Sequence, residues 1–238
     1  MKLIVATHNE GKLVEIKQIL EEQLSKLADS FELVTAGSLG LPDPVETGVT
    51  FEQNALLKAR DVAARTGYPA IADDSGLIVD VLGAAPGILS ARWSGVHGDD
   101  KANNELLLRQ LSDIPDQCRT ARFRCAAALA IPDGCSEVPE GSVMSHSHGF
   151  ETVRVGEMVG HLLREARGIN GFGYDPLFVP DLQPIRDGVQ MKGLTSAELT
   201  QEEKNAISHR GNALRALLPE LQALFITCLL YTFDAADE

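Results

Sequence analysis

The N-terminal part of the chain places an apolar strand, a tight turn and a helix in immediate succession. Residues 3–7 are apolar enough for one buried strand, and from Lys12 onward leucine and isoleucine recur at helical spacing. The segment between them, 8–11, contains asparagine and glycine, which favour a tight turn. A strand that passes directly into a helix is the building unit of α/β proteins, so this segment limits the folds open to the chain.

Further elements along the chain extend the pattern to one α/β architecture. Thr50 and Gln53 form a capping-box pattern that predicts the start of a second helix, whose polar face carries Asn54, Lys58 and Asp61. The sequence also predicts a short strand at 69–72 ending in Asp73 and Asp74, and strand-like residues at 77–82. A helix at 101–111, strands at 121–131 and 150–155, and a loop at 168–180 follow. The last helical region begins at a second capping box, Thr195 with Glu198, and continues past Leu217. Together these elements favour an α/β or α+β fold with a mixed sheet.

Charge and hydropathy restrict the functions that the chain can perform. The 238 residues include 34 acids and 21 Lys and Arg, a formal net charge of −13, which argues against a protein that coats nucleic acid. A small anionic substrate remains compatible if basic residues converge locally or a divalent cation accompanies it. No apolar run approaches the roughly 20 residues of a membrane span, and no signal-peptide core precedes residue 7, so we expect a cytoplasmic protein without a membrane partner.

The cysteines and the central histidines give no sign of a metal or disulfide framework. The four cysteines form no Cys-x-x-Cys pair, which favours a reducing compartment over a zinc ribbon or disulfide ladder. His146 and His148 lie with Cys135 in the polar stretch 132–149, without the spacing that closes a tetrahedral site. We interpret that stretch as an ordinary loop.

Two segments could bind the phosphates of an anionic ligand. The turn 7–12 brings helix-start N–H groups and Lys12 together, although such turns are also common without a ligand. Asp73 and Asp74 follow an apolar strand, where ligand crevices of α/β sheets lie, and strand alternation directs only one of them into a given crevice. With Glu46 they would suit Mg²⁺ held together with substrate phosphates; the alternative is a solvated acidic turn.

Two later segments carry groups that could bind a nucleobase. In 171–176, glycines permit close approach of a ligand, an aromatic ring can stack on a base, and Asp175 can accept hydrogen bonds from a base edge. On the last predicted helical region, Lys204, His209 and Arg210 gather potential donors to phosphate or carbonyl groups. The alternatives are a packed turn and a solvated basic helix face.

Five ordered sequence blocks make these separate signals specific. The blocks are Thr7-His8-Asn9-Glu10-Gly11-Lys12, Ala72-Asp73-Asp74-Ser75-Gly76-Leu77, Pro86-Gly87-Ile88-Leu89-Ser90-Ala91-Arg92, Gly171-Phe172-Gly173-Tyr174-Asp175-Pro176 and Ser208-His209-Arg210. On these blocks the chain resembles the Ham1/RdgB-type inosine triphosphate pyrophosphatases, from about residue 3 to residue 218.

The resemblance implies a fold and an activity. The expected fold is an elongated, ITPase-like α/β domain over residues 1–220, with a central mixed sheet, flanking helices, two lobes and the active site in the cleft between them. The expected activity is Mg²⁺-dependent hydrolysis of ITP, dITP and XTP to the nucleoside monophosphate and pyrophosphate, which removes deaminated purines from the nucleotide pool. A cytoplasmic homodimer is also implied, with no nucleic acid partner.

The resemblance further implies roles for individual residues. Asp74 would accept a proton, and Asp74 and Glu46 would hold Mg²⁺. Residues 7–12 would hold the triphosphate with Lys58 and Lys204, Ser75 would touch the substrate, and Phe172 would stack on the base. The complete expected set of substrate-binding residues is Thr7, His8, Asn9, Glu10, Gly11, Lys12, Lys58, Ser75, Phe172, Gly173, Tyr174, Asp175, Lys204, His209 and Arg210.

Two departures from the family pattern and two rival functions remain open at this stage. The family commonly has an acid at the position of Gln53, so its loss could alter the metal site or only the helix cap. Residues 221–238 do not resemble the usual family ending and are interpreted as an atypical, added or frameshifted tail. The rival functions are a Maf-like pyrophosphatase for modified pyrimidine triphosphates and a nucleotide sensor without turnover. Asp74 and the lysines argue against a pure sensor.

Overall fold

The structure is a computed structural model that describes residues 1–7, 10–23, 31–135, 138 and 149–234. The five helices of these segments are α1 (Glu10–Gln23), α2 (Phe51–Thr66), α3 (Asp100–Gln110), α4 (Gln201–Ile207) and α5 (His209–Asp234). Their strands are β1 (Lys2–Val5), β2 (Glu32–Thr35), β3 (Ala70–Val79), β4 (Thr120–Ile131), β5 (Phe150–Leu162), β6 (Phe178–Pro180), β7 (Ile185–Arg186) and β8 (Val189–Gln190).

The main sheet is mixed, as the sequence predicts. Its strand order is β2-β1-β3-β4-β5-β6, and β7 and β8 form a separate two-stranded sheet. The strand β1 pairs in parallel with both β2 and β3, whereas β5 and β6 are antiparallel. The α/β fold with a mixed sheet and flanking helices is therefore confirmed. No helix in the described ranges is both long enough and apolar enough to cross a membrane.

The chain divides into two compact units, each assembled from separate segments. Unit 1 comprises residues 1–74, 126–155 and 213–238, and unit 2 comprises 75–125 and 156–212. One boundary crosses strand β3 between Asp74 and Ser75. The two units correspond to the two lobes expected from the sequence.

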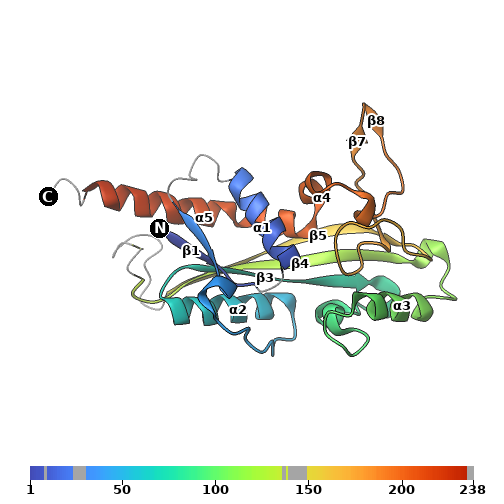
Figure 1. Cartoon of the computed structure of the whole chain (residues 1–238), viewed down its shortest axis with the longest axis horizontal. Helices are drawn as coiled ribbons and strands as arrows, with labels where there is room; N and C mark the ends of the chain where they lie inside the picture. Colours follow the sequence, from blue (N-terminus) through green and yellow to red (C-terminus); the bar gives the residue numbers. More distant parts are fainter. Residues whose placement is uncertain (8–9, 24–30, 136–137, 139–148, 235–238) are drawn as a thin grey trace. The chain divides into compact units, whose positions relative to one another are not determined.

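Unit 1 contains the predicted strand and helix at the N-terminus, and residues 8 and 9 of the turn predicted between them lie outside the described residues. The side chains of Leu3, Ile4 and Val5 on β1 are almost fully buried, as are Ile16 and Leu20 on α1. Within this unit, α2 lies on one side of the strands, and α1 and the unit 1 part of α5 lie on the other (Figure 1). The apolar stripes of these helices therefore cover both faces of a buried parallel strand pair.

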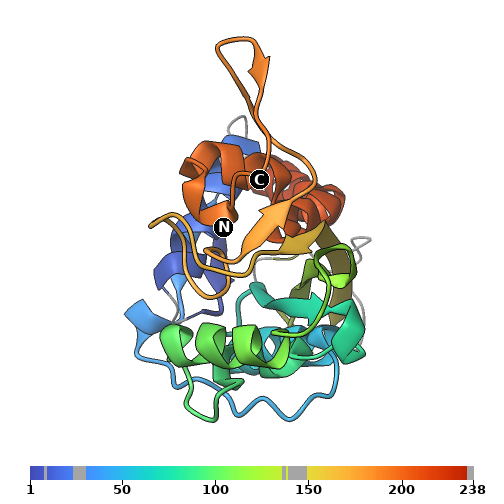
Figure 2. The same ribbon diagram turned by 90° about the vertical axis from the view of Figure 1, so that its right-hand side faces the viewer.

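Unit 2 has its own hydrophobic core. The ring of Phe123 packs edge-on against Phe178 at 4.8 Å between centroids, and it stacks on His209 at 4.9 Å. The helix α3 lies on one side of the strands of this unit and α4 on the other (Figures 1 and 2). The buried cluster comprises Leu77, Val79, Leu107, Leu111, Ala121, Phe123, Met158, Leu162, Tyr174, Leu177 and Phe178.

The prediction that a strand ends at Asp73-Asp74 is wrong. The strand β3 continues through both acids to Val79, and their side chains are buried, with exposed fractions of 2% for Asp73 and 7% for Asp74. A run of polar residues would normally end a strand, but here neighbouring lysines and an amide contact the buried acids inside the protein. A solvated acidic turn is thereby excluded.

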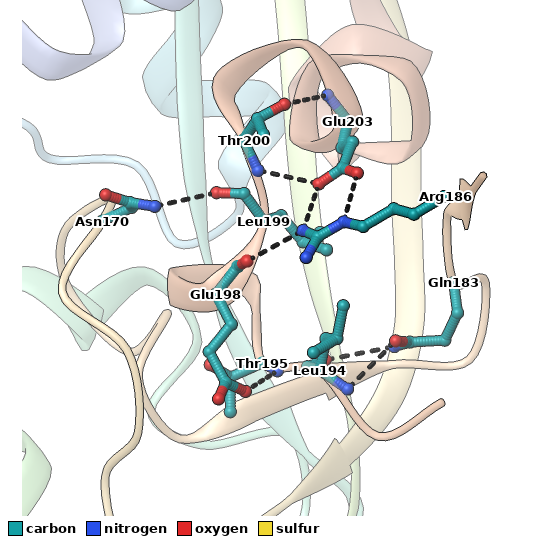
Figure 3. A network of polar contacts seen from close by, with 9 residues as sticks. All are labelled: Asn170, Gln183, Arg186, Leu194, Thr195, Glu198, Leu199, Thr200 and Glu203. Atoms are coloured by element: carbon teal, nitrogen blue, oxygen red, sulfur yellow. Dashed lines mark hydrogen bonds and ion pairs between the residues drawn. The ribbon is translucent and has the colours of Figure 1, made fainter. Parts of the chain in front are cut away.

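The last helical region is divided where a single helix was predicted. Thr195 and Glu198 form the expected capping box, but it caps only one short turn, 196–198. A second box, Thr200 with Glu203, starts α4, and α5 begins at His209. Figure 3 shows both boxes within one polar network, in which the carboxylate of Glu203 also accepts two hydrogen bonds from Arg186.

Candidate functional site

The first group of site residues lies in unit 1, where α1 begins. Thr7 follows β1 and is buried, and α1 starts at Glu10 and Gly11. Lys12, in the first turn of α1, places its Nζ 3.3 Å from Oδ2 of Asp73. His8 and Asn9, two of the expected triphosphate ligands, lie outside the described residues. A lysine at a helix N-terminus suits the binding of phosphate oxygens.

Asp74 occupies the centre of the same group. It points to a different set of partners from Asp73, as strand alternation requires. Its Oδ1 lies 3.5 Å from Nζ of Lys58, and its Oδ2 accepts a hydrogen bond of 3.1 Å from Nδ2 of Asn54. Burial raises the pKa of Asp74 above its usual value, an effect that Lys58 and Lys12 only partly offset. A carboxylate in this state can take up a proton more readily than an exposed one.

Lys58 joins Asp74 to the loop before α2. Its Nζ donates a hydrogen bond of 2.6 Å to Oε1 of Glu46. Burial alone would lower the pKa of Lys58, but Asp74, Asp73 and Glu46 outweigh that effect and raise it. Lys58 is therefore a cation held between two carboxylates, which keeps Glu46 and Asp74 near one another.

Asn54 belongs to this group, although it is absent from the site residues expected from the sequence. It is fully buried; its Oδ1 accepts a hydrogen bond from the N–H of Gly48 at 2.8 Å, while its Nδ2 binds Asp74. A side chain at Gly48 would meet Oδ1 of Asn54 at 2.5 Å, so only glycine permits this approach. The signal was present in the sequence, because Asn54 and Lys58 are four residues apart on the polar face of α2.

Gln53 serves the helix cap. The N–H of Gln53 donates to Oγ1 of Thr50 at 3.2 Å, and its Oε1 accepts from the N–H of Val49 at 2.8 Å. This contact needs only an acceptor oxygen, which an acid at this position would also supply. These contacts lie at the helix cap, one of the two places at which the loss of the acid could act.

A second group of site residues lies in unit 2, around the ring of Phe172. Nζ of Lys204 lies 5.0 Å above the ring centroid, and the guanidinium carbon of Arg210 lies 5.9 Å from it. Lys204 also donates a hydrogen bond of 2.7 Å to Oδ2 of Asp175, and Arg210 donates one of 3.1 Å to Oγ of Ser75. Two almost fully buried cations and one carboxylate thus surround a half-buried aromatic face.

Tyr174 and His209 pack into the core of unit 2. The phenol of Tyr174 donates a hydrogen bond of 2.8 Å to the carbonyl oxygen of Ser90, and burial raises its pKa. The imidazole of His209 stacks on Phe123 and is 5% exposed. Tyr174 and His209 directly precede Asp175 and Arg210 in the sequence, and protein already covers most of the surface of both side chains.

The carboxylates of unit 1 suit a cation that arrives with phosphates. Within the ranges that the structure describes, no group of three or more histidines, cysteines and acids is arranged to hold a metal ion by itself. Mg²⁺ in nucleotide enzymes commonly takes only one or two protein carboxylates and completes its shell with phosphates and water. Glu46 and Asp74, drawn toward the same lysine, fit that donor set.

Comparisons with known proteins point to one family. The sequence profile of the Ham1 family matches residues 3–220. A relative from Bifidobacterium longum, named dITP/XTP pyrophosphatase, is 59% identical over 94% of this chain and 99% of its own length.

Solved structures give the same result. The dITP/XTP pyrophosphatase of Mycobacterium abscessus is 47% identical with a TM-score of 0.66, covering 92% of this chain and 100% of its own. The Ham1 protein of Staphylococcus aureus is 33% identical with a TM-score of 0.71, covering 93% of this chain and 98% of its own. The chain belongs to the Ham1 family.

Proposed function

We propose that this chain hydrolyses non-canonical purine nucleoside triphosphates, dITP, XTP and ITP, to the nucleoside monophosphate and pyrophosphate. The observation that carries the proposal is the buried carboxylate of Asp74, held between Lys58 and Asn54. The name of the Bifidobacterium longum relative supports the substrate class. Removal of these nucleotides keeps deaminated purines out of nucleic acids, and such a role belongs in the cytoplasm, where the nucleotide pool lies.

The residues of unit 1 would bind the triphosphate and assist its cleavage. Lys12 and Lys58 supply positive charge to phosphate oxygens, as does the N-terminus of α1. A water molecule forms a bond to the α-phosphorus as the bond from that phosphorus to the bridging oxygen breaks. The water's proton passes to the carboxylate of Asp74, and pyrophosphate leaves.

Glu46 and Asp74 would hold Mg²⁺ together with the substrate phosphates, and the cation when bound neutralises charge that develops on the leaving group. Lys58 contacts both carboxylates. The raised pKa of Lys58 keeps its ammonium charged at neutral pH, so it can also bind a phosphate oxygen. We further propose a homodimer, which the family resemblance implies.

The residues of unit 2 would recognise the base. Phe172 offers an aromatic face for stacking, and Arg210 carries donors beside it. Lys204, which also lies beside the ring, would add positive charge for the triphosphate. Hypoxanthine and xanthine present a carbonyl oxygen at position 6, where adenine has an amino group, so fixed donors would reject ATP. Rejection of GTP requires a clash or an unpaired group against its 2-amino substituent.

The test is a measurement of products from purified protein. Pyrophosphate and orthophosphate release are followed with ITP, XTP, dITP, GTP, ATP and dTTP, each with Mg²⁺ and with EDTA. We expect rapid, metal-dependent release of pyrophosphate from the first three nucleotides and slow reactions with the others. Orthophosphate release would contradict the proposed bond cleavage, preference for dTTP would favour the Maf-like activity, and binding without turnover would favour a sensor.

A further inference from the structure

Two side chains of α3 hold the backbone of Gly173, the residue that follows Phe172. Oδ2 of Asp100 accepts a hydrogen bond of 2.7 Å from the N–H of Gly173. Nδ2 of Asn104 donates one of 2.9 Å to the carbonyl oxygen of the same residue. Both polar ends of one residue are thus bound by a single helix more than sixty positions away in the sequence. Neither α3 residue belongs to the expected site.

The spacing on α3 accounts for this paired contact. Asp100 and Asn104 are four residues apart, so their side chains lie one above the other on the same face of the helix. Asp100 is in the first turn, where the helix dipole stabilises a carboxylate. The same face of α3 is anchored further along the helix, because Leu107 and Leu111, seven and eleven residues after Asp100, are fully buried in the core of unit 2. The helix is therefore a rigid support for the loop.

The conformation of the loop explains why it needs such support. Gly173 adopts a left-handed backbone conformation with φ of +61°, between two aromatic residues. The preceding N–H, that of Phe172, donates to Oδ2 of Asp175 at 3.0 Å, and the following side chain, Tyr174, binds Ser90. The contacts from α3 to the N–H and the carbonyl oxygen of Gly173 fix the residue between these two.

We infer that Asp100 and Asn104 are positioning residues that fix the ring of Phe172 for stacking on the purine base. The inference rests on the proposed function, since it assigns the base to Phe172. We call the two hydrogen bonds from Asp100 and Asn104 to Gly173 the clamp. A ring that is held in place before the nucleotide arrives loses less conformational freedom on binding, so the clamp strengthens binding of the base. The reacting phosphate groups are not touched, so the clamp acts on KM and leaves kcat nearly unchanged.

Isosteric substitutions distinguish this role from a general effect on α3. Asp100→Asn retains an acceptor oxygen for the N–H of Gly173, whereas Asn104→Asp replaces the donor by an oxygen that faces a carbonyl oxygen. We expect D100N to keep a KM for dITP within about twofold of the unaltered chain, and D100A and N104D to raise it roughly tenfold. Glu105→Ala is the matched control, because Glu105 pairs only with Arg109 on the exposed side of the helix in the described contacts.

A second set of variants tests whether the clamp acts through Phe172. Phe172→Ala removes the stacking ring, so adding D100A to it should leave the KM for dITP unchanged. A residue with only a structural role would weaken binding equally in both backgrounds. Thermal unfolding of each variant, followed by circular dichroism, shows whether the fold is retained.

The outcomes separate this inference from the proposed function. An unaltered KM in folded D100A and N104D overturns the inference, as does a full D100A effect in the F172A background. If the unaltered chain hydrolyses neither dITP nor XTP, the proposed function fails. The clamp is then tested by the dissociation constant for dITP, measured by calorimetry. We expect this constant to rise in D100A and N104D and to stay unchanged in E105A; any other result overturns the inference as well.

Discussion

Asp74 meets two opposing requirements, and its contacts show how the chain balances them. A carboxylate that accepts a proton works better when it is withdrawn from water, but burial of its charge costs stability. Lys58 at 3.5 Å and the amide of Asn54 at 3.1 Å recover part of that cost. The pKa of Asp74 nevertheless stays raised, so the ionised group opposes folding at every pH above its usual value.

Asp74→Asn should therefore abolish turnover with little effect on stability. We expect hydrolysis of dITP to fall by roughly 10²- to 10⁴-fold, the usual contribution of a proton-accepting side chain. The midpoint of thermal unfolding at pH 7 should change little, because two effects oppose one another. The variant buries no ionised carboxylate at this position, but the buried ammonium of Lys58 then loses one charged partner and keeps Asp73 and Glu46. Calorimetry and an assay of pyrophosphate release measure the two effects.

The matched control for that substitution is Asp61→Asn on the exposed part of α2, where Asp61 pairs with Arg65 at 2.7 Å. Its turnover should remain close to that of the unaltered chain. A marked fall in the unfolding midpoint of D74N would show that the carboxylate stabilises the fold, contrary to its raised pKa.

Asn54→Leu should reduce kcat by about a hundredfold, the cost of misplacing a reacting group by about 1 Å. The leucine keeps the branched shape of Asn54 but loses the hydrogen bonds to Gly48 and Asp74. Gln53→Ala removes only the contact to Val49 and serves as the comparison, with a loss below about threefold for one exposed hydrogen bond. Equal losses in the two variants, measured by steady-state kinetics, would show that Asn54 supports the loop and not Asp74.

At the level of secondary structure, the sequence predicts elements well where one signal dominates. The helix α2 begins where Thr50 and Gln53 predict, and β4 matches its apolar run within one residue. The prediction fails at β3, because tertiary partners keep two acids inside a strand. It fails again near Thr195, where two capping boxes follow one another and the first encloses only a short turn. Local patterns carry no information about such distant partners.

The contacts at the start of α4 predict a pH dependence of stability. Hydrogen bonds from Arg186 and from the N–H of Thr200 lower the pKa of Glu203 to about 2 (Figure 3). A carboxyl group with a lowered pKa stabilises the folded state fully above its usual pKa, near 4.5, and this contribution disappears as the pH falls toward 2.

Glu203→Gln is the variant that isolates this contribution. Its free energy of unfolding in urea should lie below that of the unaltered chain at pH 7, and the difference should shrink steadily between about pH 4.5 and pH 2. Glu105→Gln, at an exposed acid of α3 outside the contact with Arg186, provides the control. A difference that does not change over this pH range would exclude Glu203 as its source.

For the whole molecule, the site depends on contacts that no local pattern specifies. Asp74 and Asn54 are 20 positions apart, Lys204 and Asp175 are 29 apart, and Arg210 and Ser75 are 135 apart. Each unit is assembled from segments that alternate along the chain. Composition and periodicity could therefore predict the α/β class and the types of residue that bind phosphate or a base. That these residues belong to one site was predicted only from the resemblance to a known family.

The helix α5 extends the core of unit 1 beyond the residues that match the family. The family profile ends at residue 220, and the sequence suggests an atypical tail from 221 onward. In the structure α5 continues to Asp234, and Leu221, Leu224 and Phe225 are almost fully buried in unit 1. The ring of Phe225 stacks on Phe31 at 4.5 Å between centroids. The core of unit 1 therefore extends at least five residues beyond the match to the family.

Two truncations test this limit. Burial of three large apolar side chains contributes roughly 5 kcal/mol, which is comparable with the whole stability of many domains. A chain ending at Glu220 should therefore lose cooperative thermal unfolding, whereas one ending at Cys228 should unfold like the full chain and keep its turnover of dITP. Phe225→Ala supplies an intermediate case, with an expected loss of about 3 kcal/mol in urea unfolding. Full stability of the chain ending at Glu220 would mean that these residues cover the core without supporting it, and that the domain ends where the family profile does.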